Sequence, residues 1–473
     1  MPGIRVLGIV AAALTIALVV PSGASASKGQ WSIFEDHTAL VQSGVSKRVD
    51  TLNKIKSLGA DTLRIEFHWS EITWDVHAKT KPTFDASNPA AYQGAPNAFP
   101  GFGQYDDLVL RAHAMGFRIL GTITGDAPRW ATAGGKGGSF SNANYKVNSA
   151  DYAQFAEAVA RRYAGNFAGL PAIHYFSIWN EPNHKQFLKP LSAGPAIYRR
   201  LVESGVPAVR KGGVSGVKVF VGETAPSGVA GKSTGPRAFL QRWLCLNKRW
   251  KKVRSGSCRH FKKVKADGYA HHPYGPPGNV SSKRDTISIG VIRRLGDYLN
   301  KAAARGRLSR GISIYDTEFG YQSNPPDRSV STTPSRQAKL INEKEEIHYR
   351  WGRMKSYSQY LMYDDKALFS FQTGLRFRSG KAKPAYGAFK LPIVVHNRGR
   401  RGVYIWGRVR PGRGTRYVQL YGGGRKAGPR IHTNSRGYFG VKRKRKGNYR
   451  FKAYERSGSK LKLVGTSRTA SPI

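Results

Sequence analysis

The chain contains eight short apolar segments with the composition of a β-strand, and six of them are followed by a longer segment with helical periodicity. The strand-like segments are rich in β-branched and aromatic residues. They cover residues 31–35, 62–67, 117–123, 173–179, 217–222, 267–272, 312–317 and 367–372. Strands separated by helices pair in parallel, and eight such units close naturally into a barrel. We therefore predict an α/β fold built on a (β/α)₈ TIM barrel.

Helical periodicity supports this alternation. Apolar residues recur every three or four positions in residues 45–58, and Gly59 follows as a helix C-cap would. Comparable patterns cover residues 105–115, 151–163, 195–211, 289–305 and 335–360. The alternative is a doubly wound open sheet, but no G-x-G-x-x-G motif follows its first strand.

The last part of the chain has a different composition. Residues 397–473 contain 22 Lys and Arg but one acid, Glu455. Short aromatic and β-branched runs separated by glycine-rich turns predict a small antiparallel, Ig-like β-sandwich rather than a disordered basic tail. We expect a catalytic barrel over residues 27–395 and a basic accessory domain over residues 396–473.

The N-terminus has the pattern of a secretory signal peptide at residues 1–26. Arg5 precedes an apolar run of 15 residues, 6–20, and Ala24–Ala26 is a small-x-small cleavage site. The run is shorter than the roughly 20 residues that a membrane span needs. An uncleaved anchor is the alternative. We expect a secreted, extracellular protein in which Cys245 and Cys258, the two cysteines, form a disulfide rather than two free thiols.

Two strand-like segments end in a carboxylate. Glu181 lies in IHYFSIWNEPN and Glu318 lies in GISIYDTEFG, in a chain with 28 Asp and Glu among its 473 residues. A charge at the end of an apolar strand is costly unless it is solvated or paired. Each Glu could be a turn residue or half of an ion pair. Two carboxylates on two strand ends are also the minimal equipment for glycoside hydrolysis.

The motifs around these carboxylates, Trp179–Pro182 and Thr317–Gly320, resemble clan A of the retaining glycoside hydrolases. Within the clan, the chain is most similar to the cellulase-type family five, with the β-xylosidase-type family as the close rival. The resemblance implies a (β/α)₈ enzyme with Glu181 as the acid/base after strand four and Glu318 as the nucleophile after strand seven. It implies that Arg64 holds Glu318 ionised; an ordinary ion pair of Arg64 with Glu66 is the alternative.

The resemblance also implies contacts to the sugar. Asn180 would bind the 2-hydroxyl group, and His272 and Tyr274 look like the clan's His-x-Tyr pair, with Tyr274 orienting the nucleophile. Trp69 and Trp130 follow strand ends, where they could stack on sugar rings or fill the core.

The chain departs from the clan pattern at two positions. Asp126 stands at the end of strand three, where the clan has a His, and Phe371 and Gln372 stand on strand eight in place of a Trp platform. We expect no metal and no other cofactor. Adjacent strand residues such as His271 and His272 point to opposite faces, and no HExxH motif is present.

The predicted function is therefore a secreted retaining β-glycosidase acting on a carbohydrate. The formal net charge of +50 indicates an acidic polymer or cell-wall surface as a further partner. The alternative function is a non-catalytic binding protein for such a polymer. We expect no nucleic-acid partner and no membrane span after signal cleavage.

Overall fold

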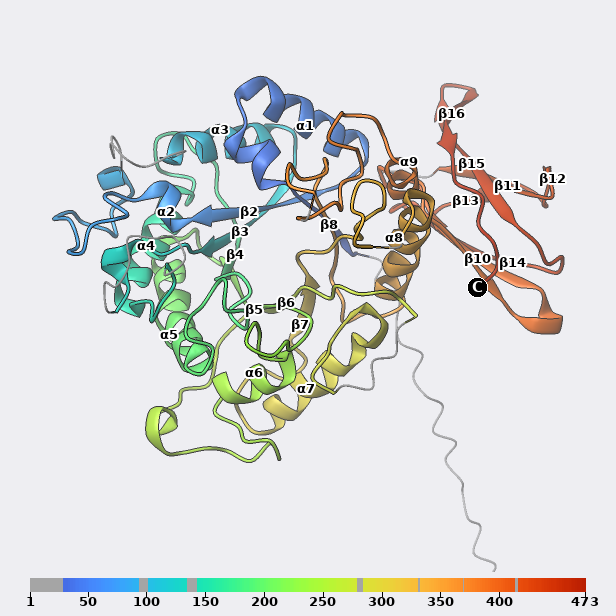
Figure 1. Cartoon of the computed structure of the whole chain (residues 1–473). Coiled ribbons are helices and arrows are strands. Elements are labelled where there is room, and N and C mark those ends of the chain that lie inside the picture. The colour runs from blue at the N-terminus through green and yellow to red at the C-terminus, as the bar shows by residue number, and fades with distance from the viewer. Residues whose placement is uncertain are drawn as a thin grey trace, which may run out of the picture.

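The computed structural model describes residues 29–92, 101–133, 143–278, 284–330, 332–368, 370–412 and 416–473. The predicted signal peptide, residues 1–26, lies outside them. The chain forms a large α/β barrel and a smaller all-β part, which lies beside α8 and α9 (Figure 1). In the described ranges, no helix combines the length and apolar character needed to cross a membrane.

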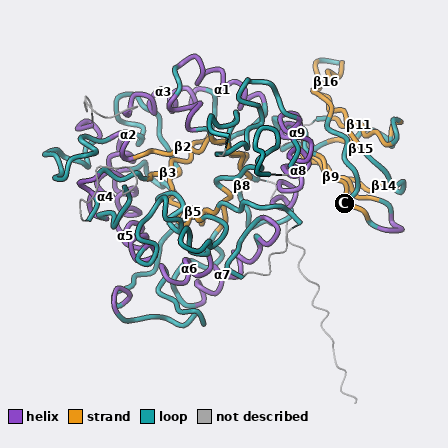
Figure 2. The backbone as a smooth tube through the Cα atoms, viewed as in Figure 1, coloured by secondary structure: helices purple, strands orange, loops and turns teal. Residues whose placement is uncertain are grey.

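Eight parallel strands form the barrel, in the order β7-β6-β5-β4-β3-β2-β1-β8. They are β1 (Trp31–Glu35), β2 (Thr62–His68), β3 (Arg118–Thr124), β4 (Tyr175–Ile178), β5 (Lys218–Thr224), β6 (Gly268–His271), β7 (Ser313–Asp316) and β8 (Ser356–Tyr360). Backbone hydrogen bonds join Ile314 to Arg353 (3.0 Å) and Lys355 (2.8 Å), which brings β7 against the start of β8. Figure 2 shows the strands as an inner ring enclosed by helices. The predicted TIM barrel is confirmed.

Helices cover the outside of this ring. They are α1 (Val45–Ser57), α2 (Trp69–Ile72), α3 (Gly101–Ala114), α4 (Ser149–Arg162), α5 (Gly194–Gly212), α6 (Pro236–Trp243), α7 (Arg293–Ala304), α8 (Pro334–Tyr349) and α9 (Pro384–Lys390). Sequence signals explain their limits. The Asn148 side chain caps α4 by accepting from the backbone N–H groups of Ala150 and Asp151. Leu52 and Ile55 on the inner face of α1 are fully buried.

The predicted eighth strand is wrong. The described residues of that segment, 367, 368 and 370–372, form no strand, and β8 is Ser356–Tyr360, within the segment for which the helical pattern predicts a helix up to residue 360. This strand is hard to recognise because two of its buried residues are serines. Ser358 donates to a carboxylate oxygen of Asp316 (2.6 Å), and Ser356 donates to its backbone carbonyl (2.7 Å). Hydrogen bonding to a buried acid replaces the aliphatic packing that a strand pattern predicts.

The C-terminal part is an antiparallel sandwich, as predicted. One sheet has the order β14-β10-β9; the other has the order β12-β11-β15-β16, with β13 paired to β11. The strands are β9 (Ile393–Asn397), β10 (Val403–Arg408), β11 (Tyr417–Gly422), β12 (Arg425–Lys426), β13 (Ile431–His432), β14 (Tyr438–Arg443), β15 (Tyr449–Ser457) and β16 (Lys460–Thr466). The predicted boundary at 395/396 falls inside β9, so the sandwich begins at Ile393.

Charged side chains join the sandwich to the barrel. Glu345 on α8 is fully buried and accepts from Arg410 (2.5 Å) and Arg408 (3.2 Å) of the sandwich. Both arginines also reach the hydroxyl of Ser32 on β1. The two parts therefore share a buried ionic contact.

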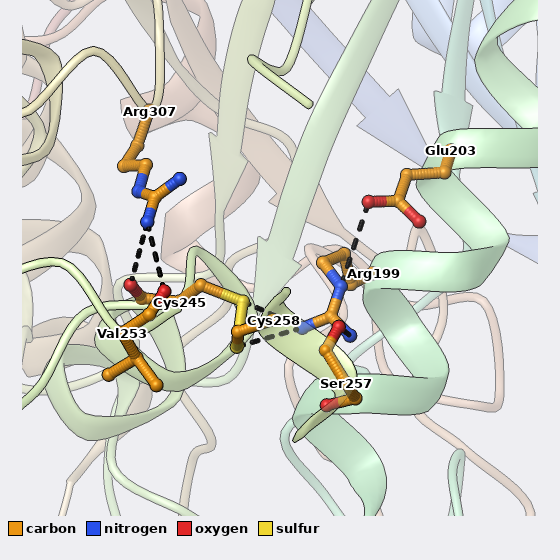
Figure 3. The surroundings of a disulfide bond; sticks show 7 residues. All are labelled: Arg199, Glu203, Cys245, Val253, Ser257, Cys258 and Arg307. Carbon is orange, nitrogen blue, oxygen red and sulfur yellow. Dashed lines mark hydrogen bonds and ion pairs between the residues drawn. A yellow bond between two sulfur atoms is a disulfide. The ribbon is translucent and has the colours of Figure 1, made fainter. Parts of the chain in front are cut away.

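The predicted disulfide between Cys245 and Cys258 is present, with its Cα atoms 5.6 Å apart. Arg199 and Arg307, both buried, lie on either side of it (Figure 3).

Candidate active site

Carboxylates gather where the barrel strands end. Glu35 is the last residue of β1. Glu66 and Glu223 lie within the last three residues of β2 and β5, and Glu181 and Glu318 follow β4 and β7. Since all eight strands are parallel, these residues meet at one face of the barrel. The predicted order, with Glu181 after the fourth strand and Glu318 after the seventh, is the observed one.

Glu181 and Glu318 form the central pair. A carboxylate oxygen of each, together with a ring nitrogen of His272, lie within 4.8 Å of one another. The carboxyl groups of retaining glycosidases are about 5–5.5 Å apart, whereas inverting enzymes need about 6.5–9.5 Å. The observed proximity fits the retaining arrangement.

Glu318 is held by two donors. The hydroxyl of Tyr274 donates to Oε1 (2.7 Å), and Nη1 of Arg64 donates to Oε2 (3.0 Å). Burial raises the pKa of Glu318 above its ordinary value, and the charges of His272 and Arg64 oppose that rise. Two donors thus fix the orientation of the Glu318 carboxyl group, and the cations beside it partly offset the effect of burial on its ionisation.

Arg64 connects several acids. Its fully buried guanidinium donates to Glu35 (2.6 Å), to Glu66 (3.2 Å) and to Oδ1 of Asn180 (2.8 Å), besides Glu318. The nucleophile contact and the alternative Glu66 ion pair are thus both present. Because the Asn180 oxygen accepts from Arg64, the amide orientation is fixed and its NH₂ group is the donor.

The ring of His272 lies between the carboxylates of Glu181 and Glu223. Nδ1 lies 2.9 Å from Glu181 and Nε2 lies 2.8 Å from Glu223, which also accepts from the hydroxyl of Thr317 (2.6 Å). Burial alone would lower the pKa of His272, but Glu318, Glu181 and Glu223 raise it well above the ordinary value. Contacts at both ring nitrogens thus hold the His272 ring in place.

His271 lies apart from this network, as predicted. Its ring nitrogens contact the Thr224 hydroxyl (2.8 Å) and the Ile287 carbonyl (2.7 Å), and burial lowers its pKa to about 4.

A second charged cluster lies at the ends of β1 and β2. Nδ1 of His68 donates to the carbonyl of Gly125 (2.7 Å), and Nε2 lies 3.3 Å from Glu66. Burial would lower the pKa of His68, but Glu66 and Glu71 raise it to about 9. A histidine is thus present near the site, on strand two rather than strand three, where Asp126 instead accepts from Asn144 (2.6 Å).

The predicted aromatic contacts have different fates. Trp69 is fully buried and stacks on Phe155 (5.3 Å between ring centroids), so the prediction that it stacks on a sugar is wrong. Trp130 is 8% exposed, packs edge-to-face on Trp69 (5.7 Å between ring centroids) and lines a cavity of about 420 Å³ whose described lining does not include Glu181 or Glu318. Phe371 is 40% exposed, and its ring centroid lies 6.2 Å from that of Tyr274. An exposed aromatic side chain therefore lies beside Tyr274, which contacts Glu318.

Sequence reasoning missed three residues of the network. The predicted site does not include Glu35 or Glu223, and it includes Glu66 only as an alternative ion-pair partner of Arg64. The signal was present, since WSIFE, TLRIEF and VKVFVGE each place a Glu at the end of an apolar strand, as around Glu181 and Glu318.

Comparisons with known proteins establish the fold. No protein-family model and no curated protein matches the chain. A family 39 glycoside hydrolase from Bacteroides cellulosilyticus WH2 is 17% identical, with a TM-score of 0.51 over 88% of this chain and 80% of that one. A monomeric β-xylosidase from Caulobacter crescentus CB15 is 16% identical, with a TM-score of 0.51 over 89% of this chain and 94% of that one. At such identities the likeness extends to the fold alone.

Proposed function

We propose that this chain is a secreted retaining β-glycosidase that hydrolyses O-glycosidic bonds in a polysaccharide or oligosaccharide. The observation that carries the proposal is the pair Glu181 and Glu318, with carboxylate oxygens within 4.8 Å and separate hydrogen-bond partners. The structural neighbours, named as glycoside hydrolases, support it.

The proposed reaction has two steps. In the first, the carboxyl proton of Glu181 passes to the glycosidic oxygen while a carboxylate oxygen of Glu318 attacks the anomeric carbon. The alcohol leaves and a glycosyl ester with Glu318 remains. In the second, Glu181 takes a proton from a water molecule, whose oxygen attacks the same carbon and releases Glu318.

The neighbours of the pair suit these roles. Arg64 and Tyr274 hold the attacking carboxylate in one orientation. The Asn180 amide would donate to the 2-hydroxyl group of the sugar, a contact that strengthens at the transition state. His272 would keep Glu181 in place in both of its protonation states, and Trp130 remains a proposed sugar contact.

The stereochemistry of the product tests this mechanism. We expect the first sugar released from an aryl β-glycoside to keep the β configuration, as seen by proton NMR before mutarotation. Glu318→Gln should lose essentially all turnover, because the covalent step disappears. Glu181→Gln should lose more activity on poor leaving groups than on activated ones, which need little proton transfer. Release of the α-anomer would rule out the retaining assignment.

Within the clan, we propose the β-xylosidase type over family five. One of the two structural neighbours, the protein from Caulobacter crescentus CB15, is named as a β-xylosidase, which supports this choice. Comparison of kcat/KM for aryl β-xyloside and aryl β-glucoside separates the two types. A preference of the purified enzyme for the glucoside would favour family five.

We further propose that the basic sandwich, residues 393–473, holds the enzyme on an acidic surface. Its 22 Lys and Arg against one acid support this role. Truncation is a poor test, since it would leave the buried Glu345 without its arginines. A triple replacement by Ala on the exposed edge, at Lys442, Lys444 and Lys446, should instead weaken co-sedimentation with an acidic polysaccharide at low salt. Retention equal to that of the wild type at every ionic strength would refute the role.

A further inference from the structure

One insertion of the barrel has no role in the proposed reaction. Residues 244–267 connect α6 to β6, so they lie on the side of the barrel opposite the strand ends that carry Glu181 and Glu318. Connections between a helix and the next strand usually take about 2–6 residues. This one takes 24 residues and carries nine Lys and Arg but one acid, Asp267.

The insertion is held in a defined conformation (Figure 3). The Cys245–Cys258 disulfide closes it, and Nη1 of Arg199 on α5 lies 3.0 Å from Sγ of Cys245. Arg199 also donates to the carbonyl of Ser257 (2.6 Å), and Arg307 donates to the carbonyls of Cys245 (3.2 Å) and Val253 (3.3 Å). Two buried guanidinium groups and a cross-link thus fix a loop that lies away from the catalytic face.

The fixed loop forms a groove against α5. A cavity of about 370 Å³ separates the end of the insertion from the C-terminal half of the helix. This volume lies within the range of about 300–1,000 Å³ that is typical of small-molecule sites. Val202, Val206 and Val264 line it as buried apolar residues, and Lys262, Lys263 and Lys265 line it as exposed cations.

The other two charged residues of the groove, Glu203 and Arg210, have ion-pair partners within the protein. Glu203 faces Arg199 at 3.6 Å, and Arg210 pairs with Asp267 at 3.0 Å. The three lysines therefore give the groove its net positive charge, above an aliphatic floor. The remaining titratable residue of the lining is His260.

We propose that this groove is a second carbohydrate site, which binds a segment of an acidic polysaccharide. The lysine ammonium groups would pair with its carboxylates, and the valine floor would contact the C–H faces of the sugar rings. Single-stranded nucleic acid fits less well, because its binding depends on aromatic stacking and the imidazole of His260 is the only aromatic ring among the described lining residues. The site is separate from the catalytic pair and from the C-terminal sandwich.

Lysine footprinting tests the site directly in the full-length protein. Acetylation of each lysine is measured by mass spectrometry, with and without an oligogalacturonate of defined length. We expect protection of Lys262, Lys263 and Lys265, while Lys248 and Lys251 of the same insertion, which do not line the groove, stay reactive. Equal protection of both groups, or none, would overturn the proposal.

Matched charge variants give the affinity. The groove triple, Lys262→Ala with Lys263→Ala and Lys265→Ala, should weaken oligogalacturonate binding about tenfold, equivalent to the loss of one charged hydrogen bond. The control triple, Lys248→Ala with Lys251→Ala and Lys252→Ala, removes the same charge from the same insertion and should leave the affinity within about twofold, as expected for charges screened by solvent. The sandwich is intact in both triples, so binding there is the same in both, and the protection of individual lysines shows whether the groove is occupied.

Two further measurements close the test. Turnover of a small aryl glycoside should be the same in both triples, because the replaced lysines lie away from the catalytic face. The affinity comparison does not use turnover, so it holds even if the glycosidase assignment fails. Oligothymidylate is the competing ligand: if the groove triple weakens its binding more than that of oligogalacturonate, the groove is a nucleic-acid site and the proposal is wrong. Equal losses of oligogalacturonate affinity in the two triples would likewise reject a defined groove.

Discussion

At the scale of single residues, the site depends on a few cations shared among many acids. The guanidinium of Arg64 contacts Glu35, Glu66 and Glu318 within 3.2 Å. Burial alone would raise the pKa of Glu66, but Arg64 and His68 lower it well below the ordinary range, so Glu66 stays ionised. A permanent negative charge thus lies within 4.8 Å of the proposed nucleophile.

This charge should be visible in the pH dependence. Burial raises the pKa of Glu318, and the charge of Glu66 raises it further. In the proposed mechanism, the acid limb of kcat/KM reports the ionisation of Glu318. Because Glu66→Gln removes the neighbouring negative charge, this limb should move to lower pH. Glu71→Gln is the control, because Glu71 contacts His37 and Tyr105 rather than the pair, and its acid limb should stay in place. An unchanged or raised acid limb in Glu66→Gln would show that Glu66 does not act on Glu318.

The His68 pair should also appear in the pH dependence of stability. The pKa of His68 rises from 6.5 to about 9 in the folded protein, so the folded state binds its proton more tightly than the unfolded state. Its contribution is complete below pH 6.5 and is lost as the pH rises through about 9. We expect the difference in unfolding free energy between wild type and His68→Gln, from urea titrations, to shrink across this window. A difference that stays constant across this pH range would contradict the raised pKa of His68 in its ion pair with Glu66.

At the scale of elements, the carboxylates of the site lie at the C-terminal ends of the strands, whereas the disulfide-linked insertion lies on the opposite side of the barrel. The insertion between α6 and β6 has little regular structure of its own, apart from the short 3₁₀ turn Gly256–Cys258. Its position depends on the disulfide and on Arg199 and Arg307. This element should therefore respond to reduction without disturbing the catalytic face.

Removing the disulfide measures that constraint. Cross-linking residues 13 positions apart is worth about 3 kcal/mol by the loop-entropy estimate. Cys245→Ala with Cys258→Ala should lower the unfolding free energy by about that amount, measured in urea. Activity on a small aryl glycoside should be retained at temperatures where the variant is folded, and wild type with dithiothreitol serves as the control. Loss of activity in the folded variant would place the insertion in the active site instead.

At the scale of the whole molecule, the sandwich packs against the barrel through aromatic and charged side chains. Trp406 and Tyr438 of the sandwich pack on Tyr349 of α8, with ring centroids 5.5 and 4.5 Å apart. Glu345 completes the contact with Arg408 and Arg410. The two parts should consequently unfold in one transition rather than two.

Glu345 tests this coupling. Glu345→Gln leaves two buried guanidinium groups without a carboxylate, which typically costs about 3–5 kcal/mol. The control is Glu455→Gln, because Glu455 is 39% exposed and faces Arg416 at 3.5 Å. A surface pair of this kind contributes about 0–1 kcal/mol. We expect a single urea transition that shifts strongly for Glu345→Gln and little for Glu455→Gln. Two separate transitions in the wild type would show that the parts fold independently.

The sequence by itself predicted the barrel, the sandwich, the disulfide and the pair Glu181 and Glu318. These features are local: an apolar run ending in a Glu, or an aromatic run between glycines, reports its own structure through hydrophobic periodicity and turn chemistry. The recurrence of the strand–Glu pattern also contained Glu35 and Glu223, so the carboxylate ring was predictable in outline.

Only the tertiary structure decided the rest. Strand β8 is recognisable through Asp316, which is 40 residues from Ser356 and accepts the hydrogen bonds of its serines. The burial of Trp69 depends on Phe155 of α4, and the charge on His68 depends on Glu66 beside it and Gly125 from the next strand. Burial, pKa and pairing are properties of the surroundings that packing creates, and residues distant in sequence supply those surroundings.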